Sequence, residues 1–292
     1  MGFKDLVTVF IPVFNAERYL EKAIESVLNQ TYENLDILII NDGSTDSSSE
    51  IISKYSEVDS RIRFISRENK GICYTRNQGV KNCKGKYLAL LDADDICMPQ
   101  RIEKQVEFLK NNPSISVVGS SVYVIDKDDN ILGVNKVKTK GEYIKASMIT
   151  GSQIVNPSAM FNFEMVKQDL VYEKNYDSAE DLQLWLELYL KGHRFANLPD
   201  KLIKYRSTST SLSHIMNEEK INMSARLIQS ALYRSGRDIS YEISNICSRN
   251  YSWKYILSCL VLLPRVKFDR YYFLRVLIFF VLVLKCIFKI LK

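Results

Sequence analysis

The sequence lacks several features that would place it in other classes of protein. None of its six cysteines belongs to a Cys-x-x-Cys pair, and several lie among apolar residues, so we expect reduced thiols that are buried or face lipid. There is no internal repeat and no low-complexity linker. The first residues, MGFKDLVTVFIP, lack the charged start and the long apolar segment of a signal peptide. These absences indicate a cytosolic protein. Its length of 292 residues allows one large domain or one domain with an appendage.

Positive charge is concentrated at the C-terminal end of the sequence. The whole chain has a net charge of +6, whereas residues 249–292 contain nine Lys or Arg and one Asp, a net charge of +8. Residues 1–248 therefore carry a net charge of −2, which argues against nucleic acid as a partner of the main domain.

The C-terminal tail is apolar but is interrupted by basic residues. Residues 271–284 (YYFLRVLIFFVLVL) are apolar except for Arg275, and Lys285 and Lys289 break the run that follows. A membrane-spanning helix needs about 20 apolar residues, so the tail is not a clean span. Basic residues among aromatic and aliphatic ones favour amphipathic helices at about 251–292 that lie on an anionic leaflet. A helical pair packed on the main domain or in a homodimer is the alternative.

Strand-like and helix-like segments alternate along the first 112 residues. Apolar, β-rich runs predict strands at residues 6–12, 35–40, 62–65 and 87–91. Periodicity and turn signals predict helices at residues 20–28, 46–55, 71–83 and 99–110. This alternation is typical of βαβ units, so we expect an α/β fold with a mostly parallel central sheet flanked by helices. Beyond Pro113, we expect strands at 116–125, 131–137, 158–163 and 202–205, and helices at 141–149, 182–190 and 218–247.

The fourth predicted strand ends abruptly in three carboxylates, Asp92, Asp94 and Asp95. Its C-terminal end should lie at the edge of the sheet where open α/β sheets bind ligands. The Asp-x-Asp pair, Asp92 and Asp94, can hold a hard divalent cation and leave positions for phosphate oxygens. A polar turn with a helix cap is the alternative.

Polar and aromatic residues also follow the first two predicted strands. Phe14, Asn15 and Glu17 come after the first strand, and Asp42 comes after the second. A ring, an amide and carboxylates at one sheet edge can stack on a planar base and hydrogen-bond it; in the alternative, Asn15 and Glu17 cap the next helix. Arg76, near the carboxylates, can pair with a diphosphate or lie on a surface helix.

Two acidic residues, Glu180 and Asp181, precede a helical segment around Trp185. Ser178 and Asp181 have the spacing of a capping box, which would make Asp181 a helix-terminus carboxylate. Alternatively, Asp181 is a general base that takes a proton from an acceptor hydroxyl. The sequence leaves both interpretations open.

A polar segment near residue 210 supplies further candidates. His214 is a candidate third metal ligand, and Arg206 with the neighbouring hydroxyls is a candidate phosphate contact. A lone histidine in a polar loop more often has neither role.

Four motifs in a fixed order resemble those of family 2 glycosyltransferases, which have the GT-A fold. The segments are VTVFIPVFNAERYLEKAIESVLNQTYENLDILIINDGSTDSS, GICYTRNQGV, KGKYLALLDADD and SAEDLQLWLEL. The similarity covers about residues 5–212 and does not extend to the tail.

The resemblance implies a role for each motif. Nucleotide-sugar donors of this family bind at the first strand ends, which assigns base and ribose contacts to Pro12, Phe14, Asn15, Glu17 and Asp42. The expected donor contacts also include Arg76, Asp92 and Ala93. The D-x-D motif, Asp92 and Asp94, implies Mn²⁺ or Mg²⁺ bound with the donor diphosphate. Asp181 matches the catalytic base, which gives inversion at the anomeric carbon, and Glu180 and Trp185 match the acceptor side.

The resemblance also implies an organisation of the chain. Residues 1–215 would form the GT-A catalytic domain, with a donor half at 1–112 and an acceptor half at 113–215. The resemblance does not extend to the tail, and it is the composition of the tail that predicts a helical C-terminal region at 216–292 with membrane-associated helices at about 251–292. The Q-x-x-R-W motif of processive members is absent, so we expect transfer of a single sugar.

The expected function is inverting, metal-dependent transfer from a nucleotide sugar, with UDP favoured, to a hydroxyl of a lipid-linked saccharide. The expected setting is bacterial cell-surface polysaccharide synthesis, with the protein attached peripherally to the cytoplasmic face of the membrane. One alternative is a polyprenyl-phosphate sugar synthase, whose acceptor is a phosphate. Another is a non-catalytic, sugar-nucleotide-binding membrane scaffold.

Overall fold

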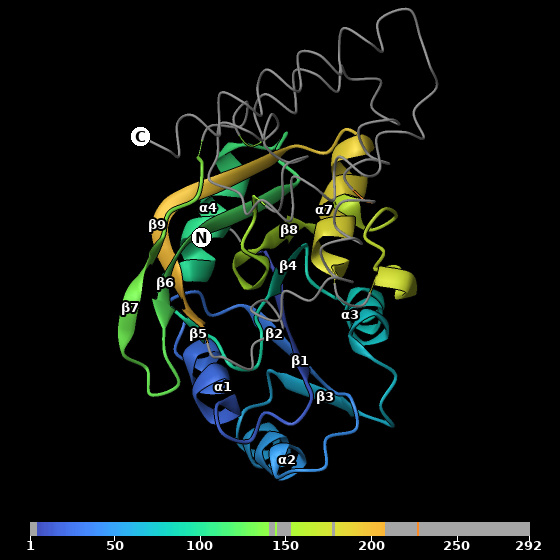
Figure 1. Cartoon of the computed structure of the whole chain (residues 1–292), viewed down its shortest axis with the longest axis vertical. Helices are drawn as coiled ribbons and strands as arrows, with labels where there is room; N and C mark the ends of the chain where they lie inside the picture. The colour runs from blue at the N-terminus through green and yellow to red at the C-terminus, as the bar shows by residue number, and fades with distance from the viewer. Residues whose placement is uncertain (1–4, 140–143, 145–152, 177–178, 208–226, 228–292) are drawn as a thin grey trace, which may run out of the picture.

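The computed structural model describes residues 5–139, 144, 153–176, 179–207 and 227. These residues form an α/β unit around one curved sheet with helices on both faces (Figure 1). The order of the paired strands is β3-β2-β1-β4-β8-β6-β9-β5, and β7 pairs with β6. The helices predicted at 141–149 and 218–247, the tail at 251–292 and His214 lie outside the described residues, apart from single positions.

The first half of the chain follows the predicted βαβ pattern. Its elements are β1 (Val7–Val13), α1 (Leu20–Leu28), β2 (Leu35–Asn41), α2 (Ser48–Val58), β3 (Ile62–Ser66), α3 (Ile72–Lys81) and β4 (Tyr87–Leu90). The four strands pair in parallel. All seven residues of β2 are buried, as expected for a strand covered on both faces.

The second half is more irregular. Its elements are β5 (Ile96–Cys97), α4 (Arg101–Asn111), β6 (Val117–Ile125), β7 (Ile131–Asn135), η2 (Asn156–Ser158), β8 (Met160–Asn162), α6 (Phe163–Val166), η3 (Lys174–Tyr176), α7 (Glu180–Leu190) and β9 (Phe195–Arg206). Strand β5 was not predicted, and β9 is longer than the predicted strand at 202–205. Among the described residues, no helix is long and apolar enough to cross a membrane.

The prediction of a mostly parallel sheet is wrong for this second half. Over the described residues, four strand pairs are parallel and four are antiparallel. A tight loop at 126–130 joins β6 to β7, and so short a connection permits only antiparallel pairing. Strand β8 lies between β4 and β6 and runs against both.

Alternate residues of the central strands supply two cores. Val9 and Ile11 of β1 belong to one cluster with α1, α2 and α4, whereas Phe10 belongs to the other with α3 and α7. This alternation follows from the two-residue period of a strand. Because helices cover both faces, the open edge formed by the ends of β1, β2 and β4 is where polar side chains collect.

Candidate active site

The turn after β4 carries the three predicted carboxylates. The backbone N–H of Asp95 donates to the carbonyl of Asp92 at 3.1 Å, which closes the turn. Asp92 and Asp94 are partly exposed, whereas Asp95 is 1% exposed and accepts the backbone N–H of Arg206 at 2.7 Å. The Asp-x-Asp pair therefore faces the open side of the turn, while Asp95 holds the turn to the end of β9.

Like charges accumulate in this turn. Burial, and next the charge of Asp92, raise the pKa of Asp94 to about 6. Burial also raises the pKa of Asp92 against the opposing charge of Arg76. Burial and the charges of Asp94 and Asp92 raise the pKa of Asp95 well above its usual value. A cation at this turn would relieve the repulsion.

The pair Asp92 and Asp94 fits a divalent cation by its chemistry. No described lysine or arginine forms an ion pair with the Asp94 carboxylate. The described part of the chain contains no third His, Cys, Asp or Glu grouped with them as a ligand. Mg²⁺ commonly binds through one or two carboxylates and completes its shell with water and substrate phosphates, which matches two ligands on an open turn.

Arg76 of α3 connects this turn to the start of α7. Its Nη2 lies 3.6 Å from Asp92 Oδ1 and 3.4 Å from Glu180 Oε1. Its guanidinium carbon lies 5.4 Å from the centre of the Tyr172 ring. The alternative of a surface arginine is wrong, because Arg76 is 6% exposed. Its Nη1 and the Tyr172 hydroxyl have no hydrogen-bond partner among the described residues, so both remain able to bind an oxygen-rich ligand.

The two predicted acceptor-side carboxylates begin α7. Glu180 and Asp181 occupy the first helical turn, where the helix dipole favours negative charge. Burial raises the pKa of Glu180 to about 7, although the charge of Arg76 opposes it. Asp181 is partly exposed, and its Oδ1 accepts the backbone N–H of Leu182 at 2.7 Å. The helix cap is Ala179, which makes no side-chain cap bond; Ser178 lies outside the described residues.

The acceptor contact predicted for Trp185 is wrong. Its side chain is 0% exposed and belongs to the core cluster beneath α7. The indole stacks on Phe161 with ring centres 5.7 Å apart and meets the edge of Phe195 at 6.3 Å. A buried ring packed between two others has no surface left for a sugar.

On the nucleotide side, Asn15 and Glu17 join two loops. Asn15 Oδ1 accepts the backbone N–H of Thr45 at 2.8 Å, and Glu17 Oε2 accepts that of Ser47 at 2.9 Å. These bonds tie the loop after β1 to the segment that precedes α2. The expected cap of α1 is not formed, because the N-cap residue of α1 is Tyr19 and the bonded N–H groups precede α2. Phe14 is 53% exposed, which leaves its ring free to stack on a base.

The other two predicted donor contacts on this side differ in exposure. Pro12 is partly exposed within β1. Asp42 is 4% exposed and pairs with Arg67, and the same oxygen, Oδ1, accepts the backbone N–H of Lys70 at 2.9 Å. Its Oδ2 accepts no hydrogen bond from the described residues, so one oxygen remains for a ligand N–H. The remaining contact, Ala93, is buried between the two carboxylates of the pair.

Asp46 holds the same two loops together and gives a pH-dependent prediction. It accepts the backbone N–H groups of Glu17 and Ser48, each at 3.0 Å. Burial opposes its ionisation, but hydrogen bonds outweigh burial and keep the pKa of Asp46 below its ordinary value of 3.8. A depressed carboxylate pKa stabilises the folded state above the unfolded value, and this stabilisation is lost as pH falls through the folded value.

We expect Asp46→Ala to lower the free energy of unfolding by about 1 kcal/mol at pH 7. The difference from wild type should shrink as pH falls below 3.8, because the unfolded wild-type chain then binds a proton at Asp46 more readily than the folded state does. Urea unfolding at pH 7, 4 and 3 measures both quantities. A difference that stays constant over this range would contradict the role of the charge.

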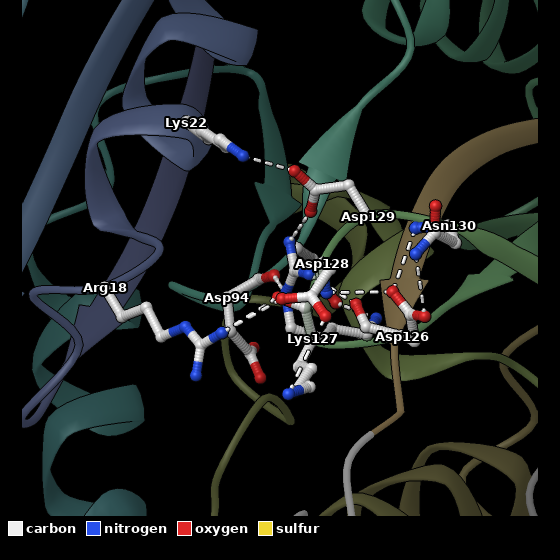
Figure 2. Close-up of polar contacts among 10 residues, drawn as sticks. Arg18, Lys22, Asp94, Asp126, Lys127, Asp128, Asp129 and Asn130 are labelled. Carbon is white, nitrogen blue, oxygen red and sulfur yellow. Dashed lines mark hydrogen bonds and ion pairs between the residues drawn. The ribbon is translucent and has the colours of Figure 1, made fainter.

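The sequence did not reveal the position of the loop Asp126–Asn130. Figure 2 shows that Lys22 of α1 and Arg18, which precedes α1, extend to Asp129 and Asp128 of this loop. The phosphate contact considered for Arg206 is wrong, because its side chain is 0% exposed and pairs with Asp129. The only signal in the sequence that this loop pairs with basic side chains was its composition, four acidic or amide side chains within five residues.

Comparison with known proteins decides the family. The family model described as glycosyl transferase family 2 matches residues 8–170, more than half of the chain. The chain belongs to glycosyl transferase family 2. The matched segment of this family 2 transferase includes the Asp92–Asp95 turn and Arg76 and ends before Glu180 and Asp181.

Relatives and solved structures agree with this family. An uncharacterised glycosyltransferase of Methanocaldococcus jannaschii is 33% identical over 94% of this chain and 93% of its own. A Bacillus subtilis protein, TuaG, provisionally named a teichuronic acid biosynthesis glycosyltransferase, is 31% identical over 73% of this chain and 83% of its own.

Two solved structures are similar in fold. Staphylococcus aureus TarS (residues 1–349) in complex with UDP-GlcNAc has a TM-score of 0.67 at 18% identity, covering 89% of this chain and 76% of that one. The mannosyltransferase PcManGT from Pyrobaculum calidifontis, in complex with GDP-Man and Mn²⁺, has a TM-score of 0.56 at 13% identity, covering 96% and 86%. The fold of this transferase is GT-A-like, and it acts on nucleotide sugars.

Proposed function

We propose that this enzyme transfers one sugar, with inversion, from a nucleoside-diphosphate sugar to a hydroxyl of a saccharide acceptor. One observation carries the proposal: Arg76 bridges Asp92 on the turn after β4 and Glu180 at the start of α7. The Arg76 guanidinium thus lies between two parts of the site. On one side is a turn suited to a diphosphate, and on the other are two carboxylates at the start of α7 that suit an acceptor hydroxyl.

The donor is placed by the ends of the central strands. The exposed ring of Phe14 stacks on the base, and the free oxygen of Asp42 accepts a ring N–H, which favours uridine. The diphosphate lies against the Asp92–Asp95 turn, where Arg76 Nη1 donates to a phosphate oxygen. TarS, which was solved with UDP-GlcNAc, supports a donor of this class.

Asp92 and Asp94 would hold Mn²⁺ or Mg²⁺, which supplies positive charge to the leaving diphosphate. The residues of the chain perform the remaining steps. Asp181 accepts the proton of the acceptor hydroxyl as the hydroxyl oxygen bonds to the anomeric carbon and the bond to the diphosphate breaks. Glu180 binds the acceptor and is itself held by Arg76. The neighbour solved with Mn²⁺ and GDP-Man supports the choice of metal.

The acceptor in this proposal is a lipid-linked saccharide at the cytoplasmic face of a membrane. Residues 249–292 carry a net charge of +8 among apolar residues, a composition that suits an anionic membrane surface. The likeness to TuaG supports a role in cell-surface polysaccharide synthesis.

The test is turnover and binding with a panel of donors. We expect the purified full chain to release nucleotide from one of UDP-Glc, UDP-GlcNAc, UDP-Gal or GDP-Man in Mn²⁺, and to lose this activity in EDTA. Re-addition of Mn²⁺ controls for damage by the chelator. Absence of both turnover and calorimetric binding for every donor would refute the proposal. Binding without turnover would direct the search to a required lipid-linked acceptor.

A further inference from the structure

Arg206, the last residue of β9, is buried at the centre of a group of contacts behind the donor turn. Its side chain is 0% exposed, and its Nε donates to the carbonyl of Asp94 at 2.8 Å. Its Nη1 donates to the carbonyl of Asp126 at 2.6 Å, and its Nη2 lies 2.6 Å from Asp129 Oδ1. The guanidinium also lies over the ring of Tyr19, 4.1 Å from its centre. One side chain thus contacts the donor turn, the loop Asp126–Asn130 and the start of α1.

The contacts with the donor turn fix its backbone. Arg206 binds the turn twice, through Nε to the Asp94 carbonyl and through its own N–H to Asp95 Oδ1. The Asp94 carboxylate points elsewhere and has no ion pair among the described residues. Arg206 therefore sets the direction of a carboxylate that it does not pair with.

The loop Asp126–Asn130 is rigid in itself and is docked by charge. Asp126 Oδ1 accepts the backbone N–H groups of Asp128 and Asn130 at 2.8 and 2.9 Å. Figure 2 shows the loop held from the side of α1, where Lys22 pairs with Asp129 and Arg18 pairs with Asp128 at 3.3 Å. Asp129 is the residue shared by both sides, because it faces Lys22 through one oxygen and Arg206 through the other.

We propose that Arg206 is a positioning residue for the donor turn and that Asp129 sets its position, so that the loop Asp126–Asn130 controls affinity for the metal-bound nucleoside diphosphate. The proposal rests on the proposed function. A planar fork can donate to two carbonyls at fixed angles, here those of Asp94 and Asp126, while it pairs with the Asp129 carboxylate by charge, which a lysine cannot do. Removal of the Asp129 charge takes away one of the groups that hold the guanidinium, so the guanidinium shifts and the Asp94 carbonyl bonded to it shifts as well.

Asp129→Asn is the first variant. Asp129 has a φ of +70°, and asparagine adopts this left-handed conformation readily, so the loop keeps its shape and loses one charge. We expect the Kd for UDP in Mn²⁺ and the donor KM to rise about tenfold, with kcat within about twofold. Arg206→Lys should raise the Kd for UDP and the donor KM at least as much. In the double variant Arg206→Lys/Asp129→Asn, these two constants should be no higher than in Arg206→Lys alone. Calorimetry with UDP and Mn²⁺ and steady-state kinetics measure these values.

Asp128→Asn is the matched control. It makes the same chemical change one residue away, at a side chain that is 54% exposed and whose ion pairs with Arg18 and Lys127 lie at the surface. Its donor Kd should stay within about twofold of wild type. An unchanged donor Kd in Asp129→Asn, or additive effects in the double variant, would overturn the proposal and leave Arg206 a stabilising cross-link. If wild type itself binds no nucleotide in Mn²⁺, the proposed function fails and this inference fails with it.

Discussion

Asp94→Asn should lower kcat for sugar transfer by about 10²–10³ and at the same time make the protein more stable. The carboxylate provides one of two candidate metal ligands, and loss of such an electrostatic contact to a leaving group typically costs about 10²–10³ in kcat. Asparagine keeps the size of the side chain, so the turn stays closed by the Asp95–Asp92 hydrogen bond.

The stability gain follows from the direction of the pKa shift. Burial and the charge of Asp92 raise the pKa of Asp94 to about 6, so the folded state binds a proton more tightly than the unfolded state does. Such a group lowers the free energy of unfolding as pH rises from 3.8 through 6. At pH 7.5 in EDTA, we expect Asp94→Asn to raise Tm by about 2–6 °C.

Thermal unfolding and donor turnover, measured on the same preparation, test both halves of this prediction. Asp200→Asn is a suitable control, because Asp200 forms a part-exposed ion pair with Lys104 away from the turn, and such pairs contribute little. Activity retained in Asp94→Asn would remove the metal site from this turn. A lower Tm would show instead that the carboxylate is a structural group.

The four parallel strands of the first half and the donor turn were predictable because they depend on local patterns. Five of the seven buried residues of β2 are apolar, and a carboxylate after a mainly apolar strand lies at the sheet edge in any parallel arrangement. The position of Asp92 and Asp94 therefore follows from sequence order alone.

The contacts of Arg206 were not predictable in this way. Arg206 meets Asp94 across 112 residues of sequence and Asp126 across 80, and no periodicity links such positions. The role of Arg76 was ambiguous for a related reason. A charged residue in a helix usually faces water, and the burial of Arg76 depends on residues distant in the sequence that pack around it.

Trp185 illustrates a different limit. Five of the six residues from Leu182 to Glu187 are buried, so α7 is apolar around most of its circumference. An amphipathic helix indicates which side faces the core, but a helix that is apolar on nearly all sides does not. The similarity of motifs was therefore the sole guide to the indole, and the packing against Phe161 contradicts it.

Asp181→Asn should reduce transfer to a hydroxyl acceptor by about 10²–10⁴ while the Kd for UDP in Mn²⁺ stays within about twofold. A general base acts on the proton of the acceptor, and Asp181 forms no ion pair with Arg76, so its loss leaves the donor contacts intact. Glu180→Gln should behave differently. Because Glu180 pairs with Arg76, which also lies near Asp92, we expect its loss to weaken binding of both acceptor and donor.

The comparison of the two variants decides which carboxylate is the base. The pKa of Glu180, raised by burial to about 7, makes it the competing candidate, since a base works best when its pKa lies near the operating pH. Loss of kcat in Asp181→Asn with only KM effects in Glu180→Gln supports Asp181, and the opposite pattern transfers the role to Glu180. Full activity of Asp181→Asn on a polyprenyl phosphate would favour a phosphate acceptor instead, because a phosphate oxygen is already ionised and needs little help from a base.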